Sequence, residues 1–406
     1  MSMRIALSGM NAATADLNVT SNNIANSNTT GFKESRAEFG DVFAASAYGL
    51  SKNAIGAGVR LQAVAQQFGQ GNIDFTGKNL DLAINGQGFF TLSDNGSMVY
   101  SRAGNFGVDK DGYVVNPSGQ RLQVYVPNAA GNGFDTGRLT DLQLSTGDSA
   151  PLATSNVTVQ SNLPANATAP AVSPFDPTDP NTYNRTTSLT VYDSLGAAHS
   201  QSLYFVKTAN PNEWQVYNYI DGTAVGGAQT LQYSPTGTLA SPSPGQIALP
   251  AYTPATGAAA MNISLDFGNS TQFGDTFGLS SLTQDGYTTG RLTGIEVGSD
   301  GVVQARYTNG VSTPLGQVAM TNFANPQGLQ PLGNNAWSET SESGQPRRGQ
   351  AGTSEFGAVQ GGALESSNVD LTAQLVNMIT AQRNFQANAQ MIQTDDQITQ
   401  TVINIR

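Results

Sequence analysis

Both ends of the chain carry apolar residues in steps of three and four positions, and a stripe of this kind must be buried against a partner. These steps place the side chains on one face of a helix, and so narrow an apolar seam is typical of a coiled coil. We expect the two ends to pack on each other or on neighbouring copies of the chain. The seam comprises Met3, Leu7, Met10, Leu17 and Ile24 in the first helix and Leu371, Leu375, Met378, Phe385, Ala389, Ile392 and Ile403 in the second.

Composition limits the classes of protein that the chain can belong to. Its 406 residues are enough for two or three domains with a sizeable core. Charged residues make up 12% of the chain, about half of the usual share, and the net charge of −11 comes without any cluster of Lys or Arg that would bind nucleic acid. Cysteine is absent, which excludes disulfides and thiol catalysis. No apolar run is long enough for membrane insertion, and we expect export without a cleaved signal.

Between the terminal helices the pattern predicts β-structure. Short alternating runs such as Leu80 to Ile84 are separated by turn pairs such as Asn85-Gly86, and a Pro- and Ser-rich stretch at 127–184 leads into a second set of strands. The fold is therefore predicted to be mainly β with α-helical termini, in which an outer β-domain is inserted into an inner one. The predicted parts are a helical coiled-coil domain at 1–30 and 365–406, an irregular connector at 31–70, an inner β-domain at 71–146 and 285–364, and an outer β-domain at 147–284.

The sequence offers no convincing catalytic, cofactor-binding or metal-binding site. His199 is the only histidine, which excludes a multi-histidine metal site within one chain, and we expect it to be a half-exposed strand residue. Glu355 with Glu365 is a possible pair of carboxylates for glycan hydrolysis, but nothing around these residues singles them out. Trp214 and Trp337 are candidate sugar platforms, although isolated aromatic residues on strands more often belong to a core.

Two long motifs at the extremes of the chain are similar to the signatures of the flagellar rod and hook family of axial proteins. The first runs from Ser21 to Lys33, and the second comprises 362–371 followed by 378–388. Further similarity comes from 79–90 and from the hairpin at 191–207, so the resemblance covers most of the chain. The motif residues are Asn22, Asn23, Ala25, Asn26, Gly31, Phe32, Lys33, Glu365, Asn368, Val369, Asp370, Gln382 and Arg383.

The resemblance implies a structural role rather than an enzymatic one. Within the family, this length and a nested central β-domain are typical of the subunits that form the hook, a hollow helical homopolymer that transmits torque from rod to filament as a universal joint. The implied partners are the distal rod protein, the hook cap, the hook–filament junction proteins and the flagellar type III export apparatus, with no nucleic acid and no cofactor. The implied location is extracellular, at the flagellar hook and basal body.

One alternative is a secreted β-rich adhesin or carbohydrate-binding module that its helices trimerise. It accounts for the polar composition and the lack of cysteine, but it does not explain helices at both ends. A glycan hydrolase with paired carboxylates is a third possibility.

Overall fold

The computed structural model describes residues 2–43, 56–128, 133–144, 147–353 and 355–404. The chain divides into two compact units. The first, here called the terminal unit, comprises Met1–Thr146, Gly294–Arg306 and Ser312–Arg406, and the second, the inserted unit, comprises Gly147–Thr293 and Tyr307–Val311. The prediction of a mainly β protein with α-helices at both termini is confirmed.

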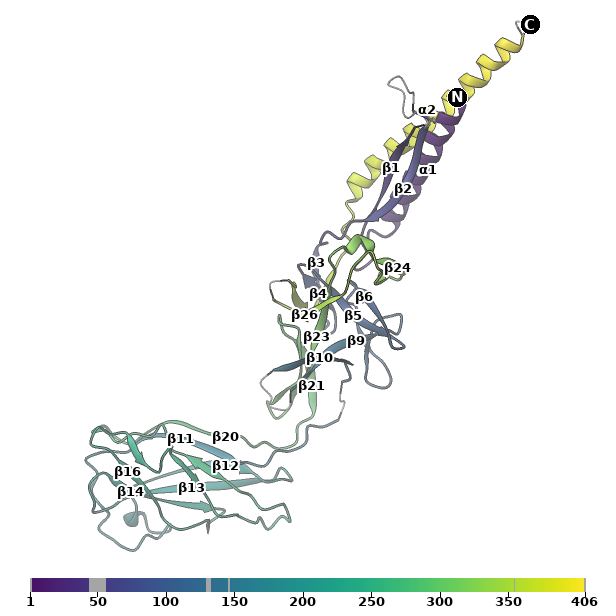
Figure 1. The fold of residues 1–406 in the computed structure, drawn as a ribbon. Helices are drawn as coiled ribbons and strands as arrows, with labels where there is room; N and C mark the ends of the chain where they lie inside the picture. The colour runs from purple at the N-terminus through teal and green to yellow at the C-terminus, as the bar shows by residue number, and fades with distance from the viewer. Residues whose placement is uncertain (1, 44–55, 129–132, 145–146, 354, 405–406) are drawn as a thin grey trace. The chain divides into compact units, whose positions relative to one another are not determined.

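The two helices lie side by side in the terminal unit (Figure 1). Helix α1 (Ser2–Ala25) ends in an Asn-rich segment, where the side chain of Asn26 donates to the Asn22 carbonyl oxygen at 3.0 Å and competes with further helical bonds. Helix α2 (Leu371–Asn404) begins after Asp370, whose carboxylate accepts from the backbone nitrogen of Thr372 at 2.8 Å. Within the described residues, neither helix has an apolar stretch long enough to span a membrane.

An antiparallel hairpin packs against α1 and corrects the prediction of an irregular connector at 31–70. Strand β1 (Ser35–Val42) pairs with β2 (Gly58–Gln66) along its whole length, with a bulge between Glu38 and Phe39. Neither strand has a fully buried face, so the hairpin lacks the row of large apolar residues that identifies a buried strand. Residues 44–55 of the predicted connector lie outside the described residues.

The β-part of the terminal unit is built from two stretches of chain on either side of the inserted unit. Strands from the first stretch pair with strands from the second, as in β9 with β23, and enclose a core that includes Phe90, Leu122 and Met320. The main sheet has the order β21 (Leu292–Val297), β22 (Val302–Tyr307), β23 (Ser312–Asn322), β9 (Arg121–Pro127), β5 (Phe89–Asp94), β6 (Ser97–Ser101), β25 (Ala336–Ser338) and β24 (Gln330–Gly333).

Shorter elements complete this part of the unit. Strands β10 and β8 pair with β9, β7 pairs with β8, and β26 pairs with β23. Two small antiparallel pairs, β3 with β28 and β4 with β27, connect the strands to the helical ends of the chain. The bounds are β3 (Ile73–Phe75), β4 (Leu82–Asn85), β7 (Gly107–Val108), β8 (Val114–Val115), β10 (Phe134–Asp141), the 3₁₀-helix η2 (Pro326–Gly328), β26 (Arg347–Gln350), β27 (Ala358–Gly361) and β28 (Ala363–Glu365).

The inserted unit packs one sheet on another around a shared core. Burial alternates along β13 and β14, and Val157, Phe205, Trp214 and Leu265 from the two sheets meet in one apolar cluster. One sheet has the order β12 (Arg185–Tyr192), β13 (Ala198–Lys207), β14 (Glu213–Ile220), β16 (Gln229–Tyr233) and β17 (Leu239–Ser241), with β15 (Thr223–Ala224) on β14 and the 3₁₀-helix η1 (Pro180–Thr182) before β12. The other has the order β18 (Gln246–Ala248), β19 (Ser264–Asp266), β11 (Asn156–Asn162) and β20 (Gly278–Gln284).

The inserted unit extends further along the chain than the outer β-domain predicted at 147–284. The chain after β20 runs back beside the segment that enters the unit, where Tyr287 bonds with Leu152 and Gly290 with Ser149. Residues 307–311 also belong to the inserted unit, and the Thr308 nitrogen donates to the Arg291 carbonyl oxygen there. These pairings connect residues far apart in sequence, which local patterns do not indicate.

Candidate functional site

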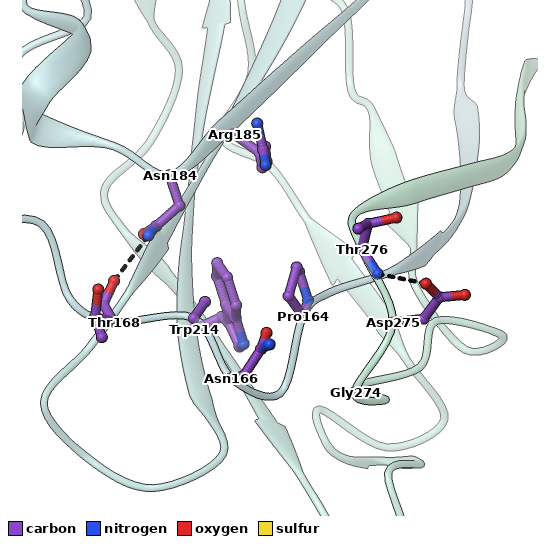
Figure 2. Close-up of a pocket in the computed structure, with 10 residues that line it drawn as sticks. Pro164, Asn166, Thr168, Asn184, Arg185, Trp214, Gly274, Asp275 and Thr276 are labelled. Atoms are coloured by element: carbon purple, nitrogen blue, oxygen red, sulfur yellow. Dashed lines mark hydrogen bonds between the residues drawn. The ribbon is translucent and has the colours of Figure 1, made fainter.

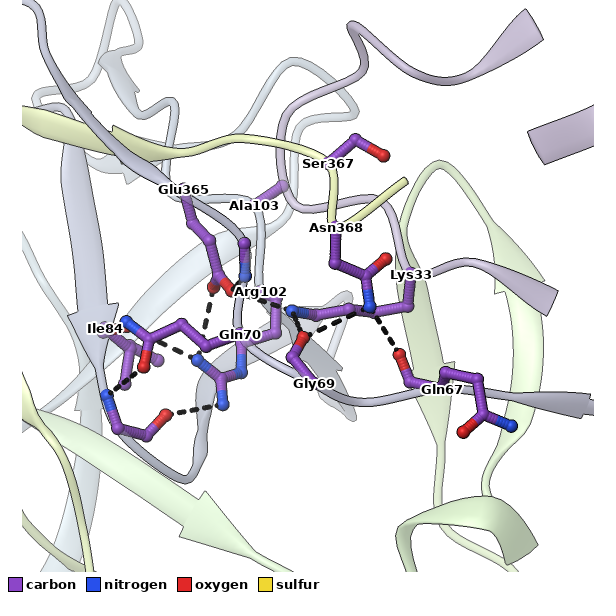
Figure 3. Close-up of polar contacts among 12 residues, drawn as sticks. Lys33, Gln67, Gly69, Gln70, Ile84, Arg102, Ala103, Glu365, Ser367 and Asn368 are labelled. Atoms are coloured by element: carbon purple, nitrogen blue, oxygen red, sulfur yellow. Dashed lines mark hydrogen bonds and ion pairs between the residues drawn. The ribbon is translucent and has the colours of Figure 1, made fainter. Parts of the chain in front are cut away.

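Three buried charged side chains join the two ends of the chain to the β-part of the terminal unit (Figure 3). The Glu365 carboxylate accepts from Lys33 Nζ at 2.7 Å and from Arg102 Nη1 at 3.2 Å, and the three side chains are at most 4% exposed. Lys33 follows α1, Arg102 follows β6 and Glu365 ends β28. We call this cluster of Lys33, Arg102 and Glu365 the terminal junction.

Backbone groups satisfy most of the other polar atoms of the terminal junction. Lys33 Nζ donates to the Gly69 carbonyl oxygen at 2.7 Å, Arg102 Nη2 donates to that of Gly86 at 2.7 Å, and the Gly71 nitrogen donates to Glu365 Oε1 at 2.9 Å. Burial lowers the pKa of the Lys33 ammonium and of the Arg102 guanidinium, while Glu365 opposes both shifts. Because removal of one partner from a buried ion pair leaves an uncompensated charge, the junction strongly favours this one arrangement of the three segments.

Two asparagines of the predicted motifs bind the hairpin to the helices. Asn23 Nδ2 donates to the Ser35 carbonyl oxygen at 2.7 Å, and the Ser35 nitrogen donates to Asn23 Oδ1 at 2.9 Å. Asn368 Oδ1 accepts from the Glu34 nitrogen at 2.8 Å, and Asn368 Nδ2 donates to the Gln67 carbonyl oxygen at 2.8 Å. Both side chains therefore hold the open end of the hairpin, where β1 begins and β2 ends, and one comes from each terminal segment of the chain.

Gly31 has a conformation and an environment that only glycine suits. Its φ of +69° lies in the left-handed region, and a Cβ at this position would lie 2.5 Å from the Ala103 nitrogen. Its own nitrogen donates to the Glu365 carbonyl oxygen at 2.8 Å, which adds a backbone contact to the terminal junction. Phe32, the next motif residue, is buried.

The structure brings together only part of the predicted motif set. Asn23, Gly31, Phe32, Lys33, Glu365 and Asn368 lie in or beside the terminal junction, and Asn26 and Asp370 cap the ends of the helices. Asn22, Ala25, Gln382 and Arg383 are exposed and Val369 is half-buried. Sequence reasoning missed Arg102 and also Gln374, whose Nε2 donates to Glu34 Oε2 at 3.1 Å, and no local pattern marks either residue.

The buried faces of the two helices are made of small and polar residues. Ala6 and Ala13 of α1 and Ala381 of α2 are buried, and a Cβ on Gly9 would lie 2.5 Å from Asn388 Oδ1. None of the predicted seam residues is fully buried in this contact. Met3, Leu7, Leu371, Leu375, Phe385 and Ile403 are between 37% and 66% exposed, whereas Met10, Leu17, Ile24, Met378, Ala389 and Ile392 are half-buried.

Further large apolar residues of the hairpin and of α2 are exposed as well. Phe39, Leu61 and Val64 of the hairpin are exposed, as are Val376 and Ile379 beside the predicted seam of α2. Large exposed apolar areas are rare on soluble monomers and mark sites of association. We call these residues, with the exposed seam residues, the terminal apolar surface.

The residues considered for catalysis or sugar binding take part in ion pairs or in the core instead. His199 is only 7% exposed, contrary to the expected half-exposed position, because its ring bonds to both Asp193 and Asp221. Glu365 is committed to the terminal junction, so it does not form a catalytic pair with Glu355. Trp214 and Trp337 are buried core residues. The described residues contain no group of His, Asp and Glu that would hold a metal ion.

Family models match four segments of the chain. They are described as flagella basal body rod protein (residues 3–33), flagellar hook protein FlgE/F/G D1 domain (83–173), flagellar basal body protein FlaE D2 domain (162–287) and flagellar basal body rod FlgEFG protein C-terminal (360–405). The N-terminal match ends at Lys33 and the C-terminal one includes Glu365, so the terminal junction lies where the matched end segments meet the β-part.

Whole-chain comparisons agree with these matches. The chain is similar to proteins named flagellar hook protein FlgE from Escherichia coli K12, at 42% identity, and Salmonella typhimurium LT2, at 40%, with 100% of both chains covered in each case. The crystal structure of Helicobacter pylori flagellar hook protein FlgE2 shares the fold, with a TM-score of 0.54 at 16% identity over 72% of this chain and 100% of that one. The resemblance inferred from the terminal motifs is confirmed, and the chain belongs to the flagellar hook protein family.

Proposed function

We propose that this chain is the repeating subunit of the flagellar hook, and that its copies associate through the terminal apolar surface into a hollow helical tube. Membership of the hook protein family supports the structural role. The observation that carries the mode of assembly is the exposure of large apolar side chains on α1, α2 and the hairpin, such as Leu7, Leu375 and Leu61. With the described residues in place, Leu61, Leu7 and Leu375 remain 43%, 47% and 50% exposed, so burial within the subunit does not account for their apolar character.

Energetics favour association of this surface over its exposure to water. Burying a Leu, Met or Phe side chain contributes about 1.5 to 3 kcal/mol, so several such contacts per subunit offset the entropy lost on assembly. Because the surface has members on two helices and a hairpin, different patches of it are available to different neighbouring copies. Contacts between different patches of successive copies generate open helical filaments.

The terminal junction gives the subunit a means to transmit load. A force applied to the packed helices reaches Lys33 and Glu365, and Arg102 passes it to the strands that hold the core of the β-part. The junction is buried and hydrogen-bonded to backbone groups of several segments, so it restricts movement of the helices relative to the strands. This coupling supports a role for the tube as a universal joint that transmits torque from rod to filament.

The finer assignments follow from the family. The distal rod protein, the hook cap, the hook–filament junction proteins and the flagellar type III export apparatus are the proposed partners, and the proposed location is extracellular, at the hook and basal body. A chain without cysteine suits passage through a narrow export channel, because no disulfide has to be kept open. Family membership favours this function over an adhesin or a glycan hydrolase.

A substitution in the terminal apolar surface tests the proposal. Leu375→Asp places a charge on a side chain that is 50% exposed in the subunit, so we expect a folded, exported protein. In the tube the charge would be buried without a partner, at a cost of several kcal/mol, so we expect no hooks by electron microscopy of a complemented hook-deficient strain.

Leu195→Asp is the matched control, because Leu195 is 62% exposed in the turn between β12 and β13 of the inserted unit. This variant should still form tubes. Hooks of ordinary stability from the Leu375 variant would contradict the proposal, as would an equal loss of tubes from both variants.

A further inference from the structure

One face of helix α2 carries a single cation beside large exposed apolar residues. Val376, Ile379 and Arg383 follow one another at steps of three and four positions, so their side chains share this face. Val376 is 59% exposed, Ile379 is 49% exposed, and Arg383 is exposed as well. Arg383 is the only basic residue of α2, and the buried Ala381, two positions before it, lies on the opposite side of the helix. We call these three residues the α2 face.

One face of the β1–β2 hairpin carries a single anion in a similar setting. Phe39 and Asp41 are two positions apart on β1, so both point to one side of the hairpin, and Leu61 of β2 lies directly opposite Phe39. Phe39 is 40% exposed, Leu61 is 43% exposed, and Asp41 is exposed. Arg60, one position before Leu61, points to the other side. We call Phe39, Asp41 and Leu61 the hairpin face.

Neither of the two charges is neutralised within the subunit. The side chains of Asp41 and Arg383 form no ion pair in the described part of the chain. Both the hairpin and α2 pack on α1, and Arg383 lies on the side of α2 away from the buried contact at Ala381. Water therefore solvates both charges in the free subunit.

Assembly would remove this water. The apolar neighbours of Asp41 and Arg383 belong to the terminal apolar surface, so burial of that surface between copies also desolvates the two charges. A buried charge without a partner is costly, whereas an arginine binds a carboxylate through two parallel hydrogen bonds. One face therefore supplies the counter-charge that the other face needs.

The hollow of the inserted unit drawn in Figure 2 lacks such a one-sided charge. Arg185 and Asp275 both line it, and Trp214, the aromatic residue in its wall, is 0% exposed. This hollow has a cation and an anion of its own and offers no aromatic ring to a neighbouring copy. The pattern of one charge among exposed apolar residues thus distinguishes the hairpin face and the α2 face from it.

We propose that the hairpin face of one copy docks on the α2 face of the next copy, with Asp41 paired to Arg383. The inference rests on the proposed assembly through the terminal apolar surface, and it names the contact within that surface. Because the two faces differ, each copy uses its hairpin face toward one neighbour and its α2 face toward another. Such a contact extends into an open helical filament.

Reversal of the charges in a complemented hook-deficient strain tests the pairing. Asp41→Arg or Arg383→Asp alone brings like charges together in the contact, so we expect loss of hooks by electron microscopy. The double variant Asp41→Arg/Arg383→Asp restores an opposite pair and should recover hooks. Arg60→Asp reverses an exposed charge on the other side of the hairpin, and this matched control should form hooks like the wild type.

Co-production of the two single variants shows whether the pair forms between copies. One variant is positive on both faces and the other is negative on both, so alternating copies satisfy every contact and hooks should reappear. A pair within one copy would be recovered by the double variant alone, which would overturn the proposal. Both side chains are exposed, so chemical denaturation of each purified variant should give the stability of the wild type.

Two further outcomes would also overturn the proposal. One is hooks from both single variants, and the other is a double variant that fails where Arg60→Asp succeeds. The proposed function is judged separately by Leu375→Asp. If that substitution abolishes hooks while both single charge variants assemble, assembly through the terminal apolar surface stands and the contact proposed here is wrong.

Discussion

Each compact unit of the molecule contains a cluster of paired charged side chains, and the two clusters differ in burial, reach and chemistry. The side chains of the terminal junction are at most 4% exposed, whereas Asp221 of the second cluster is 43% exposed. In the terminal junction, Glu365 pairs with Lys33 and Arg102 and so connects residues more than 260 positions apart. In the inserted unit, His199 lies between Asp193 and Asp221, with distances of 3.2 Å and 2.5 Å to their Oδ2 atoms. In the histidine cluster, His199 is 6 positions from Asp193 and 22 positions from Asp221.

The differences in sequence separation and in chemistry suit the two clusters to different roles in the structure. The terminal junction pairs a carboxylate with an ammonium and a guanidinium, and its two pairs join residues 332 and 263 positions apart, as expected of a connection that must hold under load. The histidine cluster ties neighbouring turns of one sheet, with Thr256 Oγ1 donating to Asp193 Oδ2 at 2.8 Å from a third segment. Its cation is an imidazole, the one side chain that ordinarily titrates near neutral pH.

The largest expected effect comes from breaking the terminal junction. Glu365→Gln keeps the shape of the side chain but leaves the charges of Lys33 and Arg102 buried without a counter-charge. We expect the free energy of unfolding of the terminal unit to fall by about 3 to 5 kcal/mol. Amide hydrogen exchange, followed peptide by peptide, should show faster exchange at β3 and β28 and unchanged exchange at β13 and β14.

Glu355→Gln is the control for this prediction, because Glu355 forms an exposed pair with Arg347 in the same unit. It should leave exchange in β3 and β28 unaltered. If both variants exchange alike, the junction does not hold the two ends of the chain to the β-part.

The second prediction concerns the response of the histidine cluster to pH. Burial lowers the pKa of His199, but its bonds to Asp221 and Asp193 outweigh burial and raise the pKa above 6.5. A raised histidine pKa stabilises the fold fully below the unfolded value, and this contribution is lost as pH rises through the folded value. We expect the inserted unit to lose stability as pH is raised from about 6 through the pKa of His199.

At acidic pH the stability of the inserted unit should change in the opposite direction, and it should fall as the pH falls. Burial raises the pKa of Asp193, but hydrogen bonds from Thr256, the Ala197 nitrogen, His199 and the Leu195 nitrogen lower it to about 2. The Asp193 contribution is therefore present above the ordinary value of 3.8 and is lost as pH falls toward 2. The inserted unit should be most stable between about pH 4 and 6.5.

Hydrogen exchange at β12–β14 across this pH range, corrected for the intrinsic rate, measures the effect. His199→Asn should be less stable than wild type at pH 6 and should no longer lose stability as pH rises. The terminal unit should not lose stability over the same range, since burial lowers the pKa of Lys33 and rising pH then acts in the stabilising direction. An alkaline loss that persists in the variant would show that another group is responsible.

Much of the fold is predictable from the sequence because it depends on local periodicity. The terminal helices and strands such as β13, β14 and β22 have strong apolar patterns, and the structure has these elements close to the predicted places. The β1–β2 hairpin was not predicted, since its residues are half-buried or exposed on both faces. The two strands pair with each other and pack on α1, and no buried apolar face marks them in the sequence. The late boundary of the inserted unit depends on long-range pairing, as between Leu152 and Tyr287.

Two residues of the terminal junction could be identified from the family motifs, but the spacing and composition of the sequence do not indicate that the junction forms. The motif contains Lys33 and Glu365, yet neither spacing nor composition indicates that they meet or that Arg102 joins them. Periodicity also does not identify the partner of an apolar stripe. The stripe has the same period whether it packs within one subunit or against another. Within the subunit, α1 and α2 approach too closely for large side chains at Gly9, so small and polar residues form that contact. Assembly through the predicted seam stays a prediction.

The smallest expected effect provides the reference for the terminal junction. Arg36 Nη2 lies 3.0 Å from Glu38 Oε1 on β1, a distance like those in the terminal junction, but the two side chains are 69% and 42% exposed. Water screens such a pair and its side chains remain mobile, so Glu38→Gln should change the free energy of unfolding by no more than about 0.5 kcal/mol. Raising the salt concentration should leave this small difference unchanged or reduce it. Chemical denaturation of the two proteins decides the point, because a loss comparable to that of Glu365→Gln would mean that distance, rather than burial, governs the strength of these ion pairs.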